Sequence, residues 1–221
     1  MIVLAIDTAG TGCFAAVYDS GTGTVLASAG ADIGRGHAEQ LMGFIDEALV
    51  ASGKVLADIH RIAVTVGPGS FTGIRVGVAA ARGFALALNV PAVGVSTLAA
   101  IAEAAREANP GRAILATIDA KRDELYCQSF EADGTPRSEA LMLEIAEAQR
   151  LFADFDGVIC GTATKHLTDQ PPASAAQTDL TDIRLVARLG AAADPSQGKP
   201  SPLYLRGPDV KSQAGFAVAR A

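Results

Sequence analysis

The stretch MIVLAIDTAGTGCFAAVYD, residues 1–19, predicts a strand, a turn of small residues and a second strand. Residues 2–6 form an unbroken apolar run, which is typical of a strand buried on both faces, and Asp7 follows directly. The same order returns later, where residues 116–119 end in a second aspartate and a turn leads to a strand at 125–130. This repetition predicts an α/β protein built from two copies of one hairpin unit.

Other segments extend each copy into a full α/β domain. Apolar residues at helical spacing predict helices, and short apolar runs bounded by turn residues predict strands. The expected helices cover residues 37–51, 71–88, 97–108, 143–152 and 181–193, and further strands cover 13–18, 24–29, 62–66, 90–95 and 158–160. The turn Asn109-Pro110-Gly111 predicts the boundary between an N-terminal domain, residues 1–108, and a smaller C-terminal domain, residues 109–221. Residues 170–178 are expected to form a loop.

The composition argues against several classes of protein. Hydrophobic residues make up 49% of the 221 residues and charged residues 19%, which supports a sizeable core and argues against disorder. The 18 basic and 24 acidic side chains give a net charge of −6, whereas a domain that grips nucleic acid alone normally has a basic surface. Membership of a complex in which another subunit holds the nucleic acid stays open.

Neither an export signal nor a membrane span is expected. The first residues carry no basic region and Asp7 interrupts their apolar run, which fits a buried strand better than a signal peptide. The most apolar later region, residues 76–95, contains Arg82, Asn89 and Pro91 and should therefore not cross a membrane. The cysteines are far apart and form no C-x-x-C pair, which favours reduced thiols in the cytoplasm: Cys13, Cys127 and Cys160.

The duplicated unit resembles the actin-like ATPase superfamily, which includes sugar kinases and the Hsp70 nucleotide domain. In that superfamily the two hairpins clamp the phosphates, and the aspartates help to position metal and water. Asp7, Thr8 and Gly10 of the first turn would fit such a site, because small residues and glycine let backbone N–H groups approach a phosphate. The alternative is a generic α/β protein in which the aspartate only caps a turn, and strand order alone does not choose between them.

The second turn, DAKRDE at residues 119–124, departs from the phosphate-clamp pattern. It contains no glycine, and charged side chains occupy positions where a phosphate loop needs bare backbone. We therefore do not expect ATP hydrolysis by the chain alone, although Lys121 and Arg122 could contact an anion at a rim. We expect no metal site either, because the three histidines lack metal-binding spacing: His37, His60 and His166.

The stretch VGPGSFTGIRVGVAAARG, residues 66–83, has the glycines of a phosphate loop but not its lysine, because no lysine lies between Gly69 and Arg75. Small residues instead recur every four positions and form a ridge: Gly69, Gly73, Gly77, Ala81 and Ala85. Glycine within a helix costs about 1 kcal/mol relative to alanine, so the ridge indicates that another element approaches this helix closely. The residues alone favour a contact inside the fold over one across an interface.

Several motifs together resemble one family, the bacterial TsaB family, also called YeaZ. The motifs are MIVLAIDTA (1–9), HAEQL (37–41), GPGSFTGIRVGVAAARGFAL (67–86), VPAVGVSTL (90–98), DAKRDELY (119–126) and PLYLR (202–206). The similarity is strong over residues 1–130, sparse over 135–195, and returns in the tail. A match to the seven-residue string GPGSFTG is too long to be a coincidence.

The resemblance implies a non-catalytic relative of TsaD. That enzyme transfers a threonylcarbamoyl group to adenosine 37 of tRNAs that read codons beginning with A. TsaD carries an H-x-x-x-H metal pair just after its equivalent strand, whereas Thr97 and Ile101 stand at those positions here. The resemblance further implies pairing with TsaD through the first two helices, with the ATPase TsaE joining the assembly. On this basis tRNA would be reached only through the complex, and ATP would bind at its interface or on partner subunits.

The expected contact surface, for TsaD or for a second copy when the chain is alone, comprises residues of the first two helices: His37, Leu41, Ile45, Phe71, Gly73, Ile74, Arg75, Gly77 and Val78. Two other functions stay open. One is an ATP-dependent kinase or hydrolase that uses Asp7, Thr8 and Asp119. The other is a metallopeptidase of the glycoprotease type, although Thr97 and Ile101 cannot bind the metal of that family.

Overall fold

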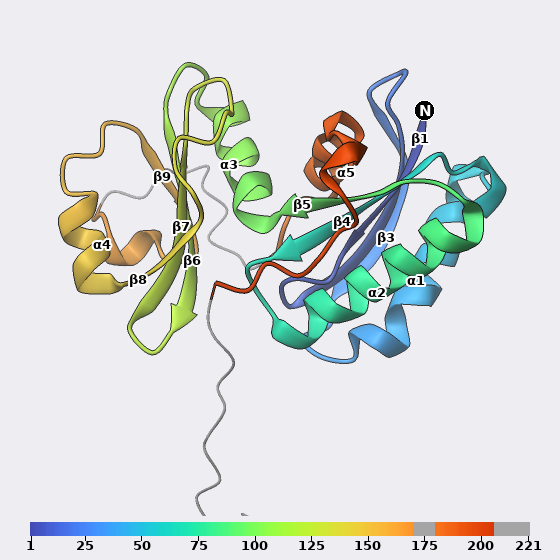
Figure 1. Cartoon of the computed structure of the whole chain (residues 1–221), viewed down its shortest axis with the longest axis horizontal. Helices are drawn as coiled ribbons and strands as arrows, with labels where there is room; N and C mark the ends of the chain where they lie inside the picture. The colour runs from blue at the N-terminus through green and yellow to red at the C-terminus, as the bar shows by residue number, and fades with distance from the viewer. Residues whose placement is uncertain (170–179, 206–221) are drawn as a thin grey trace, which may run out of the picture.

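A computed structural model describes residues 1–169 and 180–205 of the protein. It contains two β-sheets with helices packed against them (Figure 1). Sheet A has the order β3-β2-β1-β4-β5 and sheet B the order β8-β7-β6-β9. The strands of sheet A are β1 (Ile2–Asp7), β2 (Gly12–Asp19), β3 (Thr24–Asp32), β4 (Arg61–Gly67) and β5 (Ala92–Ser96). Those of sheet B are β6 (Ile114–Lys121), β7 (Glu124–Phe130), β8 (Leu141–Glu144) and β9 (Val158–Gly161). The helices are α1 (His37–Ser52), α2 (Phe71–Leu88), α3 (Thr97–Ala108), α4 (Ile145–Leu151) and α5 (Ile183–Ala192).

The two sheets repeat one arrangement. In sheet A, β1 pairs with β2 in antiparallel fashion and with β4 in parallel. In sheet B, β6 pairs with β7 in antiparallel fashion and with β9 in parallel. The repeated hairpin that the sequence predicts is therefore confirmed, and the chain has a duplicated α/β fold.

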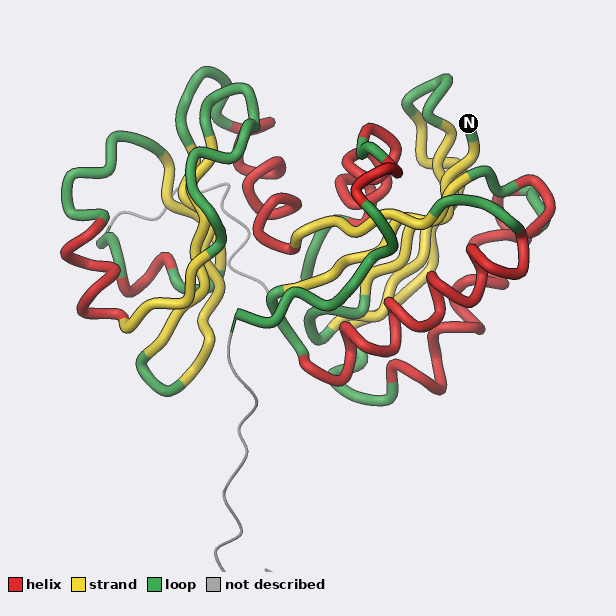
Figure 2. Tube along the Cα trace, in the orientation of Figure 1, coloured by secondary structure: helices red, strands yellow, loops and turns green. Residues whose placement is uncertain are grey.

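Helices cover both faces of sheet A because the side chains of its central strand alternate between two cores. Leu4 and Ile6 of β1 lie in the core beneath α1 and α2, whereas Val3 and Ala5 lie in the core beneath α5. Figure 2 shows α1 and α2 running side by side on one side of the sheet and α5 on the other. One face of the pair formed by α1 and α2 is thus buried, and the opposite face is left to solvent.

The sequence predicts a domain boundary at residue 108, but two helices each pack on the sheet formed from the other side of this boundary. Helix α3 precedes that residue but packs Leu98 and Ala102 against sheet B. Helix α5 follows it but returns to sheet A, where the Arg61 guanidinium donates to the backbone oxygens of Gly190, Ala191 and Ala193 at 3.0, 2.9 and 2.7 Å. The packing therefore differs from the predicted limits of 1–108 and 109–221.

Local differences from the predictions are small. The edge strand β8 was not predicted, and α4 is shorter than the helix expected at 143–152. The loop predicted at 170–178 lies outside the described residues.

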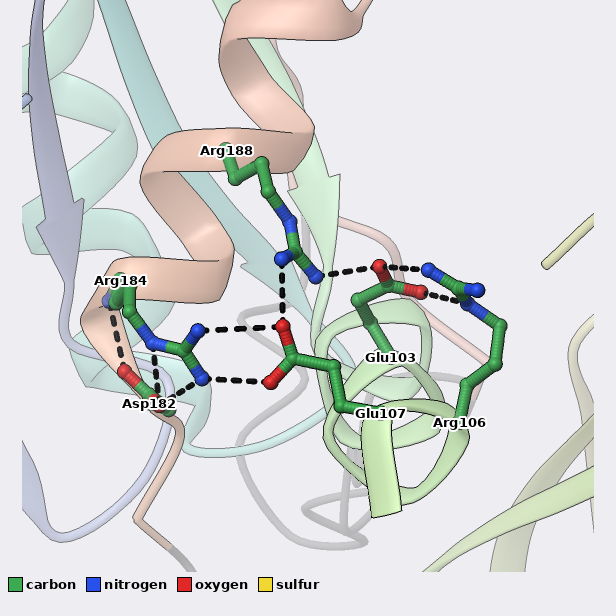
Figure 3. A network of polar contacts seen from close by, with 6 residues as sticks. All are labelled: Glu103, Arg106, Glu107, Asp182, Arg184 and Arg188. Atoms are coloured by element: carbon green, nitrogen blue, oxygen red, sulfur yellow. Dashed lines mark hydrogen bonds and ion pairs between the residues drawn. The ribbon is translucent and has the colours of Figure 1, made fainter. Parts of the chain in front are cut away.

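An ion-pair network joins α3 to α5 (Figure 3). Arg184 contacts Glu107 at 2.7 Å, Arg188 contacts both Glu103 and Glu107 at 2.5 Å, and Arg106 contacts Glu103 at 2.6 Å. Hydrogen bonds from Arg184 and then Arg188 lower the pKa of Glu107 to about 2. Since α3 packs on sheet B and α5 on sheet A, the network ties the two sheets together.

We expect this network to weaken in acid. A carboxylate with a lowered folded-state pKa stabilises the fold fully above its ordinary pKa of 4.5, and the contribution is lost as the pH falls toward about 2. Because a third of the Glu107 side chain is exposed, we expect a loss of only about 1 kcal/mol. Thermal unfolding at several pH values should show that Glu107→Gln flattens the acid decline, whereas Glu47→Gln on the exposed side of α1 does not. Parallel curves for wild type and Glu107→Gln would contradict the assignment.

Candidate functional site

The aspartate at the end of β1 is enclosed by the fold. Asp7 is 2% exposed, and its Oδ1 accepts hydrogen bonds from the backbone N–H of Ala9 at 3.0 Å and from the Thr65 hydroxyl at 2.6 Å. Burial raises the pKa of Asp7, although these hydrogen bonds oppose the shift. Asp7 therefore acts within sheet A, where it holds the ends of β1 and β4 together.

The other two residues predicted for a nucleotide site lie in different surroundings. Thr8 is fully buried, and its hydroxyl donates to the backbone oxygen of Gly73 in α2 at 2.7 Å. Gly10 borders a cavity between the two sheets. Of the three residues, only Gly10 is placed where a ligand could reach it without rearrangement.

The second hairpin carries a carboxylate surrounded by cations. Asp119 accepts a hydrogen bond from the backbone N–H of Lys121 at 2.9 Å, and its other oxygen lies 3.4 Å from Lys121 Nζ and 3.5 Å from Lys165 Nζ. Burial raises the pKa of Asp119, but the Lys121 hydrogen bond and the two ammonium charges outweigh it, so the net shift is downward. Asp119 is therefore held as a paired carboxylate at the edge of the same cavity.

The cavity between the sheets has a volume of about 350 Å³. Both hairpin turns and the first turns of α2 and α3 border it, through residues that include Gly10, Ser70, Thr97, Ile101, Asp119 and Tyr126. Thr97 and Ile101 occupy the two positions at which, according to the resemblance described above, TsaD carries its metal-binding histidines. Among the described residues, no group of three His, Cys, Asp or Glu side chains is placed to hold a metal ion.

Most of the predicted contact surface lies inside the chain. Only Phe71 and Arg75 are exposed, and the other seven predicted residues are buried: His37, Leu41, Ile45, Gly73, Ile74, Gly77 and Val78. His37 Nε2 lies 3.2 Å from the backbone oxygen of Gly12, so it fastens the start of α1 to β2. These seven residues could influence a partner only through the shape of the helices.

The small-residue ridge of α2 faces the end of β1, not a neighbouring surface. A Cβ added at Gly73 would lie 2.0 Å from the Thr8 backbone oxygen, and one added at Gly77 would lie 2.4 Å from Thr8 Oγ1. A Cβ at Gly69 would lie 2.2 Å from the Ala9 oxygen. The close approach that the sequence predicts is present, and its partner is the turn after β1.

The exposed residues of α1 and α2 include several apolar and small ones, and we call these, together with Arg75, the helix-pair face: Met42, Gly43, Phe71, Arg75, Ala79, Gly83 and Leu86. The exposed fractions are 84% for Leu86, 52% for Phe71 and 45% for Met42. A Cβ added at Gly43 or Gly83 would meet nothing within 4 Å. By length and composition α2 could also cross a membrane, but its other side packs against sheet A.

Tyr204 extends the helix-pair face from the C-terminal side. Its ring centre lies 5.5 Å from that of Phe71, and its hydroxyl accepts a hydrogen bond from Arg75 Nε at 2.8 Å. The Arg75 guanidinium lies 3.7 Å from the centre of the Phe71 ring. Sequence reasoning used Tyr204 only as part of the PLYLR motif, and it missed Met42, Ala79, Gly83 and Leu86, because a helical period does not reveal which face a sheet will cover.

Comparisons with known proteins agree on one family. A family model described as TsaD, tRNA N6-adenosine threonylcarbamoyltransferase, matches residues 31–170. The tRNA threonylcarbamoyladenosine biosynthesis protein TsaB of Escherichia coli (strain K12) is 38% identical over 134 residues, which cover 60% of this chain and 56% of that protein. The TsaB of Haemophilus influenzae is 36% identical over 126 residues, which cover 57% and 52%. The chain thus spans about half the length of these curated relatives.

Full-length similarity comes from other proteins. An uncharacterized protein of Mycobacterium tuberculosis (strain ATCC 25618 / H37Rv) is 31% identical over 218 residues, which cover 96% of this chain and 95% of that one. A solved structure of YeaZ from Pseudomonas aeruginosa is 28% identical, with a TM-score of 0.73 over 92% of this chain and 99% of that one. A second Pseudomonas aeruginosa structure, described as similar to peptidase YEAZ, has a TM-score of 0.75 at 27% identity over 93% and 99%.

Proposed function

Because the chain belongs to the TsaB (YeaZ) family, we propose that it is a non-catalytic subunit of the cytoplasmic complex that forms N6-threonylcarbamoyladenosine at position 37 of tRNAs reading codons that begin with A. Its relatives are named as biosynthesis proteins for this modified nucleoside. Its partner in the proposal is TsaD, the transferase, and TsaE joins the pair. The net charge of −6 supports contact with tRNA through the complex and not through this chain alone.

The helix-pair face is the observation that carries the proposal. Leu86, Phe71 and Met42 expose large apolar side chains on the outer side of two adjacent helices. Exposed apolar patches on soluble proteins mark interaction sites, and the open glycines Gly43 and Gly83 would let a partner helix come close. The equivalent helices of TsaD, or those of a second copy when TsaD is absent, would cover this face.

The residues at the hairpins support a non-catalytic role. Asp7 and Thr8 are buried and bonded within sheet A, and Asp119 is paired with two lysines. A catalytic carboxylate must be within reach of the reacting group. Asp7 is not within reach, because it is buried within sheet A. We therefore propose that the chain has no cofactor of its own and that any ATP binds at the TsaD interface or on partner subunits.

An ATP-dependent kinase or hydrolase is the second candidate, because Gly10 and Asp119 from both hairpins border one cavity. Incubation of the purified chain with ATP and Mg²⁺ separates the two functions. The subunit proposal expects no turnover in the absence of partners, and sustained ATP hydrolysis by the chain alone would favour the enzyme.

Depletion of the chain in its native cell tests the proposed function directly. We expect N6-threonylcarbamoyladenosine in bulk tRNA, measured by mass spectrometry of nucleosides, to fall and to recover when the wild-type chain is supplied. TsaD should also be captured with the tagged chain from the same cells. An unchanged level of the modified nucleoside after complete depletion would contradict the proposal.

A further inference from the structure

The Arg75 guanidinium on the helix-pair face is held in one orientation by two aromatic side chains. It lies 3.7 Å from the centre of the Phe71 ring, and its Nε donates a hydrogen bond to the Tyr204 hydroxyl at 2.8 Å. Phe71 is 52% exposed and Tyr204 is 48% exposed, so the three side chains stand at the surface of the chain. An arginine at a surface normally keeps its rotamer freedom, whereas stacking and the hydrogen bond restrict this one.

The outer end of the Arg75 guanidinium has no partner in the part of the chain that the structure describes. Neither Nη1 nor Nη2 donates to an acceptor there, and no carboxylate there forms an ion pair with Arg75. The arginines between α3 and α5 differ, because Arg106, Arg184 and Arg188 each contact a glutamate. Two parallel donors on a planar group match the two oxygens of a carboxylate. Arg75 therefore carries a donor pair that is already in position to receive one.

The helix around Arg75 supplies no negative charge. Helix α2 contains two arginines, Arg75 and Arg82, and no aspartate or glutamate. A partner that covers the helix-pair face would remove water from the Arg75 guanidinium, which is costly unless the partner provides an opposite charge with good hydrogen bonds. The surface thus favours a partner that places a carboxylate opposite Arg75 over one that is wholly apolar there.

We propose that TsaD places a carboxylate against Arg75 and that Tyr204 is the positioning residue for this contact. The inference rests on the proposed function, in which TsaD covers the helix-pair face, and it adds the chemical group that TsaD carries at this point. Phe71 supports the guanidinium from one side, Tyr204 holds its Nε, and the carboxylate accepts from Nη1 and Nη2. Because the donor pair is ordered before binding, little rotamer freedom is lost when the contact forms.

Calorimetry of the purified chain with purified TsaD tests the contact. Arg75→Gln should weaken binding by about 30-fold or more, because the carboxylate of TsaD would be buried without its cation. Arg75→Lys keeps the charge but loses the paired donors, and should weaken binding about tenfold. Tyr204→Phe keeps the ring and should weaken binding a few-fold. If Tyr204 acts through Arg75, that last loss disappears when Tyr204→Phe is combined with Arg75→Gln.

Substitutions in TsaD identify the carboxylate. Each aspartate or glutamate on the TsaD helices equivalent to α1 and α2 is changed in turn to its amide. One of these changes should weaken binding of the wild-type chain about as much as Arg75→Gln does. The same change should cause little further loss against Arg75→Gln, because the two groups form one interaction.

Arg150→Gln is the control, because Arg150 is also an exposed arginine in a helix but lies in α4 beside sheet B. It should bind TsaD like wild type, and every variant should unfold within about 2 °C of wild type. Wild-type affinity of Arg75→Gln, an equal loss in Arg150→Gln, or the lack of any coupled TsaD carboxylate would overturn the inference and leave TsaD as the partner. Failure of the wild-type chain to bind TsaD would instead overturn the proposed function, and this inference with it.

Discussion

Replacing Gly73 with alanine is expected to lower the free energy of unfolding by about 3 kcal/mol, whereas the same change at Gly83 should raise it by about 0.5–1 kcal/mol. Both residues lie inside α2, so helix propensity favours alanine equally at each. Only the surroundings differ. At Gly83 a Cβ would meet nothing within 4 Å, but at Gly73 it would lie 2.0 Å from the Thr8 backbone oxygen.

The neighbours of Gly73 have little freedom to move. Thr8 follows β1, which is the central strand of sheet A, and its hydroxyl also donates to the Gly73 oxygen at 2.7 Å. To admit a methyl group, α2 must move away from the strand, which would break this hydrogen bond and open the core around Ile74. Alanine at Gly77 should lower the free energy of unfolding by less than alanine at Gly73, because its Cβ would meet the Thr8 side chain at 2.4 Å instead of the backbone.

Urea denaturation gives the change in free energy of unfolding and thermal denaturation gives the melting temperature, each followed by circular dichroism. We expect the melting temperature of Gly73→Ala to fall by about 6–12 °C and that of Gly83→Ala to rise slightly. Equal stability of the two variants would show that α2 does not pack on β1 through its glycine ridge. Larger residues at Gly73 consequently test the fold of the chain before they test any contact with a partner.

The ridge shows how far sequence reasoning reaches in this chain. A four-residue period of small side chains predicts close packing on one side of a helix, and that side is confirmed as buried. It does not identify the packing partner, because Thr8 is 65 residues away in the chain and is brought near only by the sheet. The outer, apolar side of α2 could be recognised only once its buried side was known.

The hairpin repeat was predictable for a different reason. An apolar run that ends in aspartate and a turn is a local pattern, and it recurs with the same order of elements. The placement of α5 was not predictable, since nothing within an amphipathic helix says which of two sheets it covers. Strand β8 has only four residues, which is too short for the sequence pattern to distinguish it from the start of the helix that follows.

For the candidate site residues, the sequence indicates which polar side chains lie at the end of a strand, but not whether these side chains are exposed. Asp7 ends a strand and Thr8 follows it, in a position where side chains can face a ligand or the interior. Their partners Thr65 and Gly73 come from distant elements and turn both inward. Thr97 entered the sequence reasoning as part of the motif VPAVGVSTL and as the residue that replaces a metal ligand. That its hydroxyl is unpaired among the described residues is a property of three-dimensional packing and has no local pattern.

Replacing Leu86 with glutamate is expected to weaken binding of TsaD by about 100-fold or more, with no loss of stability in the isolated chain. Leu86 is 84% exposed, so the folded chain tolerates a charge there to within about 0.5 kcal/mol. In a complex that covers the helix-pair face, the carboxylate would be buried without a partner, which costs about 3 kcal/mol or more.

Leu151→Glu is the matched control, because Leu151 is also an exposed leucine at 58% but ends α4 beside sheet B. Calorimetry of each purified variant with TsaD, together with the level of the modified nucleoside in cells that carry it, gives two readouts. Wild-type affinity of Leu86→Glu, or an equal loss in Leu151→Glu, would show that TsaD does not bind the helix-pair face. Because Leu86→Glu is expected to leave stability unchanged whereas Gly73→Ala is expected to lower it, the two variants on one helix separate a loss of stability from a loss of binding.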